Sequence, residues 1–408
     1  MDLNQLIVYH HLSVDPQVIK VLLYCVEKNT MDENEWMAIL LDLAEKYDLH
    51  GHLFQGLLTY LLAHHENAFT LSLERKQPIQ DSLKKVVMKD LEFIFQLYHY
   101  DFINLNPLYK DLFFDFPHSK PVMNQEIFDL LTQLQLQLSL CTSVEEFYTI
   151  LYNHYEHYGV GQYGLNKAFR FQNNQIIPIE HIGNNTLDQL IGYNSQKERL
   201  KANTEAFLQG KKANNVLLYG DSGTGKSSSI KALLNEYYKD GLRMVEVYKH
   251  QFIDLPRIIN ELQNRRYKFI IFMDDLSFEE FEVEYKYLKA VIEGGLEKKP
   301  DNILIYATSN RRHLIKETWN DRNHDQEINN NDAKQEKLSL VSRFGVQIMY
   351  IHPDKQHYLD IVDGLAETYH IDMQREELHD LALQWEIRNG GFSGRTAKQF
   401  IHMLLGKR

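Results

Sequence analysis

The stretch from Gly220 to Ser227, GDSGTGKS, has the residue types and spacing of a phosphate-binding loop. It fits G-x-x-x-x-G-K-[ST], an apolar run (NVLLYG) precedes it, and a run with helical spacing (SSSIKALLNEYY) follows it. Glycines let successive backbone N–H groups point at one phosphate, and the positive end of the following helix reinforces them. We expect Lys226 to reach the β- and γ-phosphates and the Ser227 hydroxyl to bind Mg²⁺. The residues predicted to bind the nucleotide are Gly220, Asp221, Ser222, Gly223, Thr224, Gly225, Lys226, Ser227 and Ser228.

Two adjacent aspartates follow the later apolar run KFIIFM. P-loop enzymes hold their metal with an aspartate at the end of such a strand, and we assign that role to Asp274. Asp275 is favoured as the carboxylate that orients the attacking water, with a purely structural helix cap as the alternative. P-loop ATPases often carry a glutamate there, and a misplacement of ~1 Å can slow a reaction by on the order of 10²-fold. Either the backbone lies closer, or a water bridges, or turnover is slow; Glu279 and Glu280 are candidate substitutes.

The elements that must position these side chains alternate between strand and helix after residue 187, which is typical of a parallel sheet covered on both faces. The five predicted strands are NVLLYG, RMVEVY, KFIIFM, NILIYAT and VQIMYI. The capping box Ser195–Glu198 predicts the start of a helix that ends at Gly210, and Ser143–Glu146 predicts another helix start.

The predicted fold is α/β: a P-loop αβα core with a five-stranded parallel sheet and a C-terminal helical lid, preceded by a mainly α-helical domain. The predicted divisions are an acidic N-terminal domain (1–172), a linker (173–186), the core (187–352, with a mobile insertion at 317–337) and the lid (353–408). GVGQYG, from Gly159 to Gly164, matches a dinucleotide-binding pattern, but a helical pattern precedes it where that fold needs a strand. A turn that ends a helix, or a packing loop, is the favoured interpretation.

Charge and cysteine content indicate the class of partner. Residues 1–180 contain 12 Lys+Arg and 23 Asp+Glu, a net charge of −11 out of −12 for the chain, so direct nucleic-acid binding there is not expected. A protein partner of the N-terminal domain is the better expectation. Cys25 and Cys141 are far apart, and no apolar run reaches the roughly 20 residues of a membrane helix. The N-terminal MDLNQLIVYHH has an aspartate where an export signal would carry positive charge, so we expect a cytoplasmic protein without membrane contact.

The polar residues behind the loop resemble those of the AAA+ ATPases. Asn310 follows a predicted strand as that superfamily's sensor 1 residue does, with Thr308 and Ser309 as neighbouring alternatives. Arg343 precedes the fifth strand, where these proteins carry an arginine finger, and Arg395 opens a C-terminal helix at the position of sensor 2. Arginine suits both roles because its permanently charged fork matches phosphate oxygens. Each arginine alone could also be a surface ion pair.

The same resemblance implies two further properties. Ile191 and Gly192 stand where the superfamily's adenine pocket is lined. The finger of these proteins usually reaches in from a neighbouring subunit, which implies a homo-oligomer. More narrowly, residues 155–408 resemble a bacterial AAA+ family catalogued as domain of unknown function eight-one-five, through YGVGQYGLNKAFRF, LIGYNSQKERLKANTEAFLQGKKANNVLLYGDSGTGKSS, FMDDLSFE, YATSNRRHL and GFSGRTAKQF.

These patterns together predict a protein that binds ATP with Mg²⁺, hydrolyses it to ADP and phosphate, and couples hydrolysis to movement of the lid and N-terminal domain. Three alternatives remain open. One is an ATP-dependent switch with negligible hydrolysis, a second is a P-loop kinase, and a third is a loader that acts on a DNA-bound protein.

Overall fold

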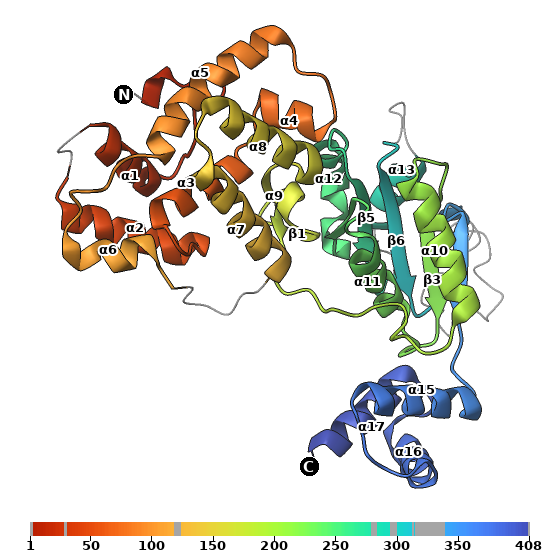
Figure 1. Cartoon of the computed structure of the whole chain (residues 1–408). Helices are drawn as coiled ribbons and strands as arrows, with labels where there is room; N and C mark the ends of the chain where they lie inside the picture. The colour runs from red at the N-terminus through yellow and green to blue at the C-terminus, as the bar shows by residue number, and fades with distance from the viewer. Residues whose placement is uncertain are drawn as a thin grey trace. The chain divides into compact units, whose positions relative to one another are not determined.

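The structure is a computed structural model that describes residues 3–27, 31–117, 124–278, 284–293, 300–311, 314 and 339–406 (Figure 1). The predicted insertion at 317–337 and the candidate carboxylates Glu279 and Glu280 lie outside the described residues. The chain forms two compact units, Met1–Asn166 and Lys167–Arg408. None of the described helices has the length and hydropathy needed to cross a membrane.

The first unit, which we call the N-terminal unit, is helical, as its apolar periodicity predicts. One core holds it together, with the rings of Trp36, Phe54 and Tyr98 fully enclosed. Ser143 caps α8 by accepting a hydrogen bond from the N–H of Glu146, which confirms that predicted helix start. The described helices of this unit are η1 (Leu3–Gln5), α1 (Pro16–Val26), α2 (Glu33–Tyr47), α3 (Leu53–His64), α4 (Ala68–Glu74), α5 (Asp81–Tyr98), α6 (Pro107–Phe114), α7 (Gln125–Leu140), α8 (Val144–Tyr158) and α9 (Gly161–Leu165).

The glycine pattern from Gly159 to Gly164 lies between two helices. Gly159 ends α8 with a positive φ of 82°, and the short helix α9 begins two residues later. Because no strand precedes the pattern, it lacks the backbone arrangement of a dinucleotide site. The helix-ending interpretation is confirmed.

The second unit is built on a seven-stranded sheet in the order β2-β1-β4-β5-β6-β3-β7. All neighbouring strands are parallel except the β1–β2 pair, which is an antiparallel hairpin. The strands are β1 (Ala168–Gln172), β2 (Gln175–Pro178), β3 (Val216–Gly220), β4 (Leu242–Glu246), β5 (Lys268–Met273), β6 (Ile303–Ser309) and β7 (Val346–Tyr350). The α/β class and the five parallel strands are confirmed.

The hairpin corrects two predictions, because the sheet has seven strands rather than five and the predicted linker 173–186 begins inside it. Asn173 and Asn174 make the turn with φ angles of 51° and 61°. Asparagine tolerates such left-handed angles, and two of them in succession form the tight turn that suits a two-residue hairpin. The asparagines that suggested a linker are therefore the turn of the hairpin.

Helices cover the sheet, and their buried faces carry the same apolar periodicity as their sequences. The described helices here are α10 (Asn194–Leu208), α11 (Lys226–Tyr237), η2 (Lys249–Asp254), α12 (Leu255–Leu262) and α13 (Glu284–Glu293). Apolar side chains of α10 and α11 pack with Val216, Leu218 and Ile270 in one cluster. The alternate side chains Ile271 and Ile305 are buried as well, so both faces of the sheet are covered.

The predicted capping box at Ser195 is wrong. Tyr193 is the N-cap of α10, in the left-handed conformation and without a side-chain cap, and the Ser195 hydroxyl bonds Gln196 instead. Tyr193 is fixed by its own contacts, because its hydroxyl donates to Ile351 O at 2.9 Å and its ring lies 5.0 Å from that of Tyr350. These packing contacts start the helix one residue before the predicted box.

Three helices follow the sheet: α15 (Lys355–Thr368), α16 (Arg375–Asn389) and α17 (Gly394–Gly406). They enclose a small apolar core of their own that includes Tyr358, Ala382 and Phe400. This is the helical lid that the sequence predicts.

Candidate functional site

The loop between β3 and α11 turns at Gly220, where the backbone leaves the sheet. Gly220 has a φ of 129°, and a Cβ there would lie 1.9 Å from Tyr350 O. Only glycine can occupy this position, because the neighbouring strand β7 is already in contact. The N–H of Asp221 then donates to the same Tyr350 carbonyl at 2.9 Å. The loop therefore starts from a point fixed by two strands.

Lys226, the first residue of α11, lies at the centre of the loop and is 6% exposed. Its Nζ donates to Gly220 O at 2.9 Å, to Asp221 O at 2.5 Å and to Asn310 Oδ1 at 3.0 Å. Burial lowers the pKa of Lys226, while the nearby carboxylates of Asp221, Asp275 and Asp274 oppose that shift. The ammonium group is thus held inside the loop, at the start of a helix whose free N–H groups also favour an anion.

Asp274 stands at the end of β5 and joins two hydroxyl groups. Its Oδ1 accepts hydrogen bonds from Ser227 Oγ at 2.5 Å and from Thr308 Oγ1 at 2.6 Å. A carboxylate and a serine hydroxyl are hard oxygen donors of the kind that Mg²⁺ prefers, with phosphate oxygens and water completing its octahedron. Among the described residues no group of three or more His, Cys, Asp or Glu could hold a metal alone. The donor set therefore fits a metal shared with a phosphate ligand.

Asp275 has a left-handed backbone, with φ at 50°. Its N–H donates to Thr308 Oγ1 at 2.9 Å, and its Oδ1 accepts from Asn310 Nδ2 at 2.7 Å. Residues 276–278, directly after it, are not helical. The carboxylate is therefore oriented from β6, and the described residues that directly follow it form no helix for it to cap.

Asn310 and Thr308 are brought to this place by the strand order. Strand β6 lies between β3 and β5 and is parallel to both, so its carboxyl end adjoins the loop after β3 and the aspartates after β5. Asn310 therefore touches Lys226 on one side and Asp275 on the other. Ser309, the third sensor candidate, is buried, and its hydroxyl accepts from the N–H of Arg311.

These residues line one cavity of about 580 Å³ in the second unit. Its polar end is the loop and the carboxylates, and its other walls are the segment before α10 and the lid helices α15 and α17. Of the residues predicted from sequence, it brings together Ile191, Ser222, Gly223, Thr224, Gly225, Lys226, Ser227, Ser228, Asp274, Asp275, Asn310 and Arg395.

Two hydrogen bonds connect the loop with the lid and with the segment that precedes it. The N–H of Arg395 donates to Gly223 O at 3.2 Å, and the Asp221 carboxylate accepts from the N–H of His352 at 2.7 Å. His352 belongs to the segment that joins β7 to α15. The loop is therefore bonded both to the lid helix α17 and to the segment that leads into the lid, and Arg395 lines the cavity.

Four predicted site residues do not line the cavity: Gly220 and Asp221, which start the loop, and Gly192 and Arg343. Gly192 packs under the His357 ring, where a Cβ would lie 1.7 Å from Nε2, so it supports the wall that Ile191 forms. Arg343 is half exposed, and its Nη2 forms an ion pair with Glu293 Oε1 at 3.0 Å. Within this single chain the described contacts of Arg343 are those of a surface ion pair.

The cavity also contains residues that the sequence did not single out. Lys398 lies one turn after Arg395 on α17, a helical spacing that could have signalled it. Thr308 had been only an alternative to Asn310, yet it bonds both aspartates. Leu365 and Tyr369 close the lid side and carry no motif.

The site and fold define a P-loop α/β protein with a helical lid, in agreement with the AAA+ architecture that the motifs resemble. The chain belongs to the family described as "Protein of unknown function (DUF815)", whose model matches residues 165–408. This confirms the narrower resemblance. Among curated proteins, no sequence matches this chain at a significant level.

Several solved structures share part of the fold. A RuvB mutant from Thermotoga maritima is 16% identical, with a TM-score of 0.36. The match covers 52% of this chain and 62% of the RuvB chain, so it spans less than two thirds of that protein's length. The Thermotoga maritima RuvB Holliday junction branch migration motor is 14% identical, with a TM-score of 0.35, and the match covers 54% of this chain and 72% of that chain. The FIGL-1 AAA domain in complex with ADP is 14% identical, with a TM-score of 0.38, and the match covers 53% of this chain and 72% of that chain. At these values the likeness carries no inference about activity.

Proposed function

We propose that the protein binds ATP with Mg²⁺ and hydrolyses it to ADP and phosphate. The observation that carries the proposal is the chain of contacts from Lys226 through Asn310 to Asp275, beside the Ser227–Asp274 pair, at the polar end of one cavity. A lysine at a helix start, two hydroxyls and two carboxylates are the groups that phosphoryl transfer to water requires. The apolar side chains of Ile191 and Leu365 at the cavity's other walls offer a surface for a base.

Each residue then has a defined task. The loop N–H groups and Lys226 bind the phosphates, in exchange for the carbonyl contacts that Nζ makes now. Ser227 and Asp274 would hold Mg²⁺, which when bound offsets charge on the phosphate oxygens. Asp275, held by Asn310, orients the attacking water through its carboxylate. Catalysis is then mainly positioning and charge stabilisation.

Assembly completes the site in this proposal. Arg343 lies outside the cavity of its own chain and is half exposed, so it is available to enter the cavity of a neighbouring copy. Arg395 acts from the lid of the same chain, where its side chain already faces the cavity. We expect a homo-oligomer, in which the N-terminal unit recruits a protein partner. A cytoplasmic location agrees with two buried cysteines that are both free thiols.

Phosphate release from the purified protein, measured at rising protein concentration with Mg²⁺ and ATP, tests this proposal. Turnover per chain should rise steeply as the chains assemble. A flat, negligible rate at every concentration would refute hydrolysis while leaving binding to be measured separately.

A second candidate function is an ATP-dependent switch with very slow hydrolysis. The observation that favours it is the short carboxylate of Asp275, one of whose oxygens is already occupied by Asn310. The loop–lid contacts of Asp221 and Gly223 would transmit binding without turnover. ATP that remains intact while it changes the protease sensitivity of the lid would identify this switch.

A further inference from the structure

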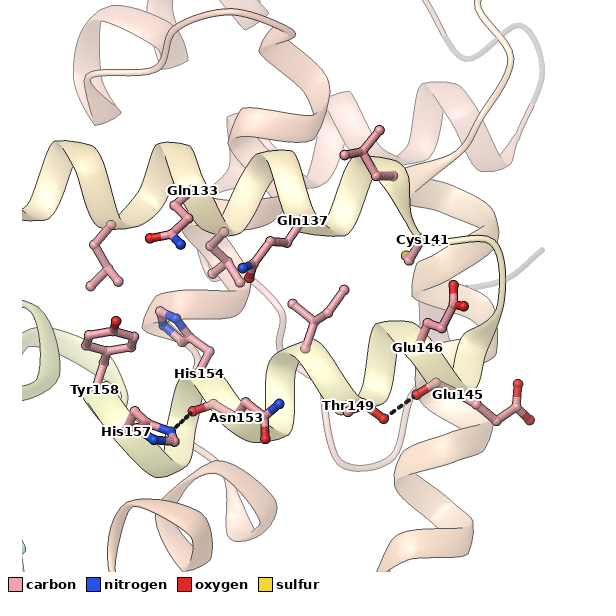
Figure 2. Close-up of a pocket in the computed structure, with 14 residues that line it drawn as sticks. Gln133, Gln137, Cys141, Glu145, Glu146, Thr149, Asn153, His154, His157 and Tyr158 are labelled. Carbon is pink, nitrogen blue, oxygen red and sulfur yellow. Dashed lines mark hydrogen bonds between the residues drawn. The ribbon is translucent and has the colours of Figure 1, made fainter.

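A long groove lies between α7 and α8 of the N-terminal unit, far in sequence from the loop motifs. It has a volume of about 810 Å³ and runs along both helices, which are joined by the short connection 141–143 (Figure 2). From Leu130 to Leu140 it spans about 15 Å of α7, at 1.5 Å per residue.

The floor of the groove is apolar, and Leu130 and Leu134 stand one helical turn apart in it. Leu130, Leu134 and Leu140 contribute from α7, and Ile150 contributes from α8. Leu140 is 71% exposed, and Tyr158 at the opposite end is 48% exposed. An apolar strip that two helices leave open in this way is an unfilled helix-packing position.

Polar side chains with free hydrogen-bonding capacity stand along the walls. Figure 2 shows Gln133 and Gln137 of α7 and His154 of α8 pointing into the space between the helices. Among the described residues, the two glutamine side chains have no hydrogen-bond partner. His154 is 5% exposed, and its buried Nε2 also lacks a partner in the described part of the chain.

The charge of the groove is acidic. Glu145 and Glu146 stand at one end, and no Lys or Arg lines the groove. Glu146 accepts hydrogen bonds from the N–H and hydroxyl of Thr142, and neither carboxylate forms an ion pair with a described residue. An occupant with cationic side chains at this end would supply the ion-pair partners that both carboxylates lack among the described residues.

We propose that this groove binds an amphipathic α-helix of a protein partner, with leucine-like side chains along one face and Lys or Arg facing Glu145 and Glu146. A helix is the fitting occupant because it satisfies its own backbone hydrogen bonds. In the described part of the N-terminal unit only one isolated bridge, between Gly51 and Phe116, has strand character, so no sheet edge is available to an extended peptide. The proposal deepens, and rests on, the proposed recruitment of a protein partner by this unit.

Synthetic 18-residue amphipathic helices test the proposal on the full chain. One peptide combines a leucine ridge with lysines at one end, and its partner peptide has glutamates in place of the lysines. Fluorescence anisotropy should show saturable binding of the basic peptide and weak binding of the acidic one. Leu140→Gln and the pair Glu145→Lys with Glu146→Lys should each weaken binding of the basic peptide by about tenfold or more.

Matched controls lie on the same unit. Leu136→Gln changes another exposed leucine of α7 that does not line the groove, and Glu92→Lys changes an exposed carboxylate of α5; both should bind the basic peptide normally. Equal loss in the control variants, equal binding of both peptides, or no saturable binding would overturn the proposal. A dimer of the free chain that Leu140→Gln dissociates would overturn it too, because the occupant would then be a second copy.

ATP hydrolysis measured on the same preparations separates this proposal from the proposed activity. The groove variants should keep the ATP turnover of the unaltered chain, because none of them lies in the nucleotide cavity. Peptide binding without any ATP turnover would refute the proposed hydrolysis and leave the proposed helix-binding groove standing. ATP turnover without peptide binding would refute the groove proposal and leave the proposed hydrolysis standing.

Discussion

Asn310 Nδ2 donates to Asp275 Oδ1 at 2.7 Å, so the residue that follows β6 orients the second aspartate after β5. The same amide accepts from Lys226 Nζ through its oxygen at 3.0 Å. A single side chain thus connects the cation proposed to bind phosphate with the carboxylate proposed to orient water. Substitutions at Asp275 test that connection.

Asp275→Asn should reduce kcat by about 10² to 10⁴-fold and leave the affinity for ATP nearly unchanged, because it removes only the proton-accepting carboxylate. Asp275→Glu should hydrolyse ATP at least as fast as the unaltered protein, since its longer side chain reaches further toward the γ-phosphate. Steady-state kinetics with a separate binding measurement checks both variants. Normal turnover by Asp275→Asn would show that this carboxylate has no part in the reaction.

Arg343→Ala should spare ATP affinity and abolish the rise in turnover on assembly, a loss on the order of 10³-fold if the side chain acts as a finger. Glu293→Gln breaks the ion pair but keeps the arginine, so stimulation should survive. Arg388→Ala, an exposed arginine of α16, is the matched control. An oligomer of Arg343→Ala with full turnover would disprove the finger assignment.

Asp221→Ala should weaken ATP binding by about tenfold, because the N–H of His352 loses its carboxylate partner and one of the two bonds that connect the loop with the lid and its leading segment is broken. Asp221→Asn keeps an acceptor and should lose less. Isothermal titration gives the affinities, and limited proteolysis reports the lid. Unchanged affinity in Asp221→Ala would mean that the lid segment is positioned without this bond.

Stability of the N-terminal unit should fall between pH 7 and pH 5. Burial lowers the pKa of His154 to about 4. Below pH 6.5 this histidine is therefore protonated in the unfolded chain, whereas in the folded chain it stays neutral until the pH approaches 4. The contribution of His154 to the free energy of unfolding is therefore fully present above pH 6.5 and is lost as the pH falls toward 4. At pH 5 the loss is on the order of 1–2 kcal/mol. Urea unfolding at both pH values should show a smaller fall for His154→Leu than for the unaltered chain. An equal fall in both would exclude His154 as a cause.

The contiguous parts of the site could be predicted from sequence. The loop carries its own glycines, its lysine and its hydroxyl, and Asp274 and Asn310 each follow an apolar strand. Parallel strands end at one edge of a sheet, so their last residues meet there whatever the loops between them contain.

Features that depend on partners distant in the sequence could not be predicted. Tyr193 starts α10 because it contacts Ile351 and Tyr350, and no local pattern contains that information. The β1–β2 hairpin was hidden because its asparagine turn also has the composition of a linker. The groove of the N-terminal unit exists only because α7 and α8 pack with Leu140 left outside.

Titration of the purified protein with a fluorescent ATP analogue and Mg²⁺ tests the central claim most directly. The account predicts saturable binding, displaced by ATP and ADP, that Lys226→Ala removes while the surface variant Lys355→Ala keeps it. Absence of any binding by the unaltered protein, or undiminished binding by Lys226→Ala, would contradict the claim that this loop binds a nucleotide.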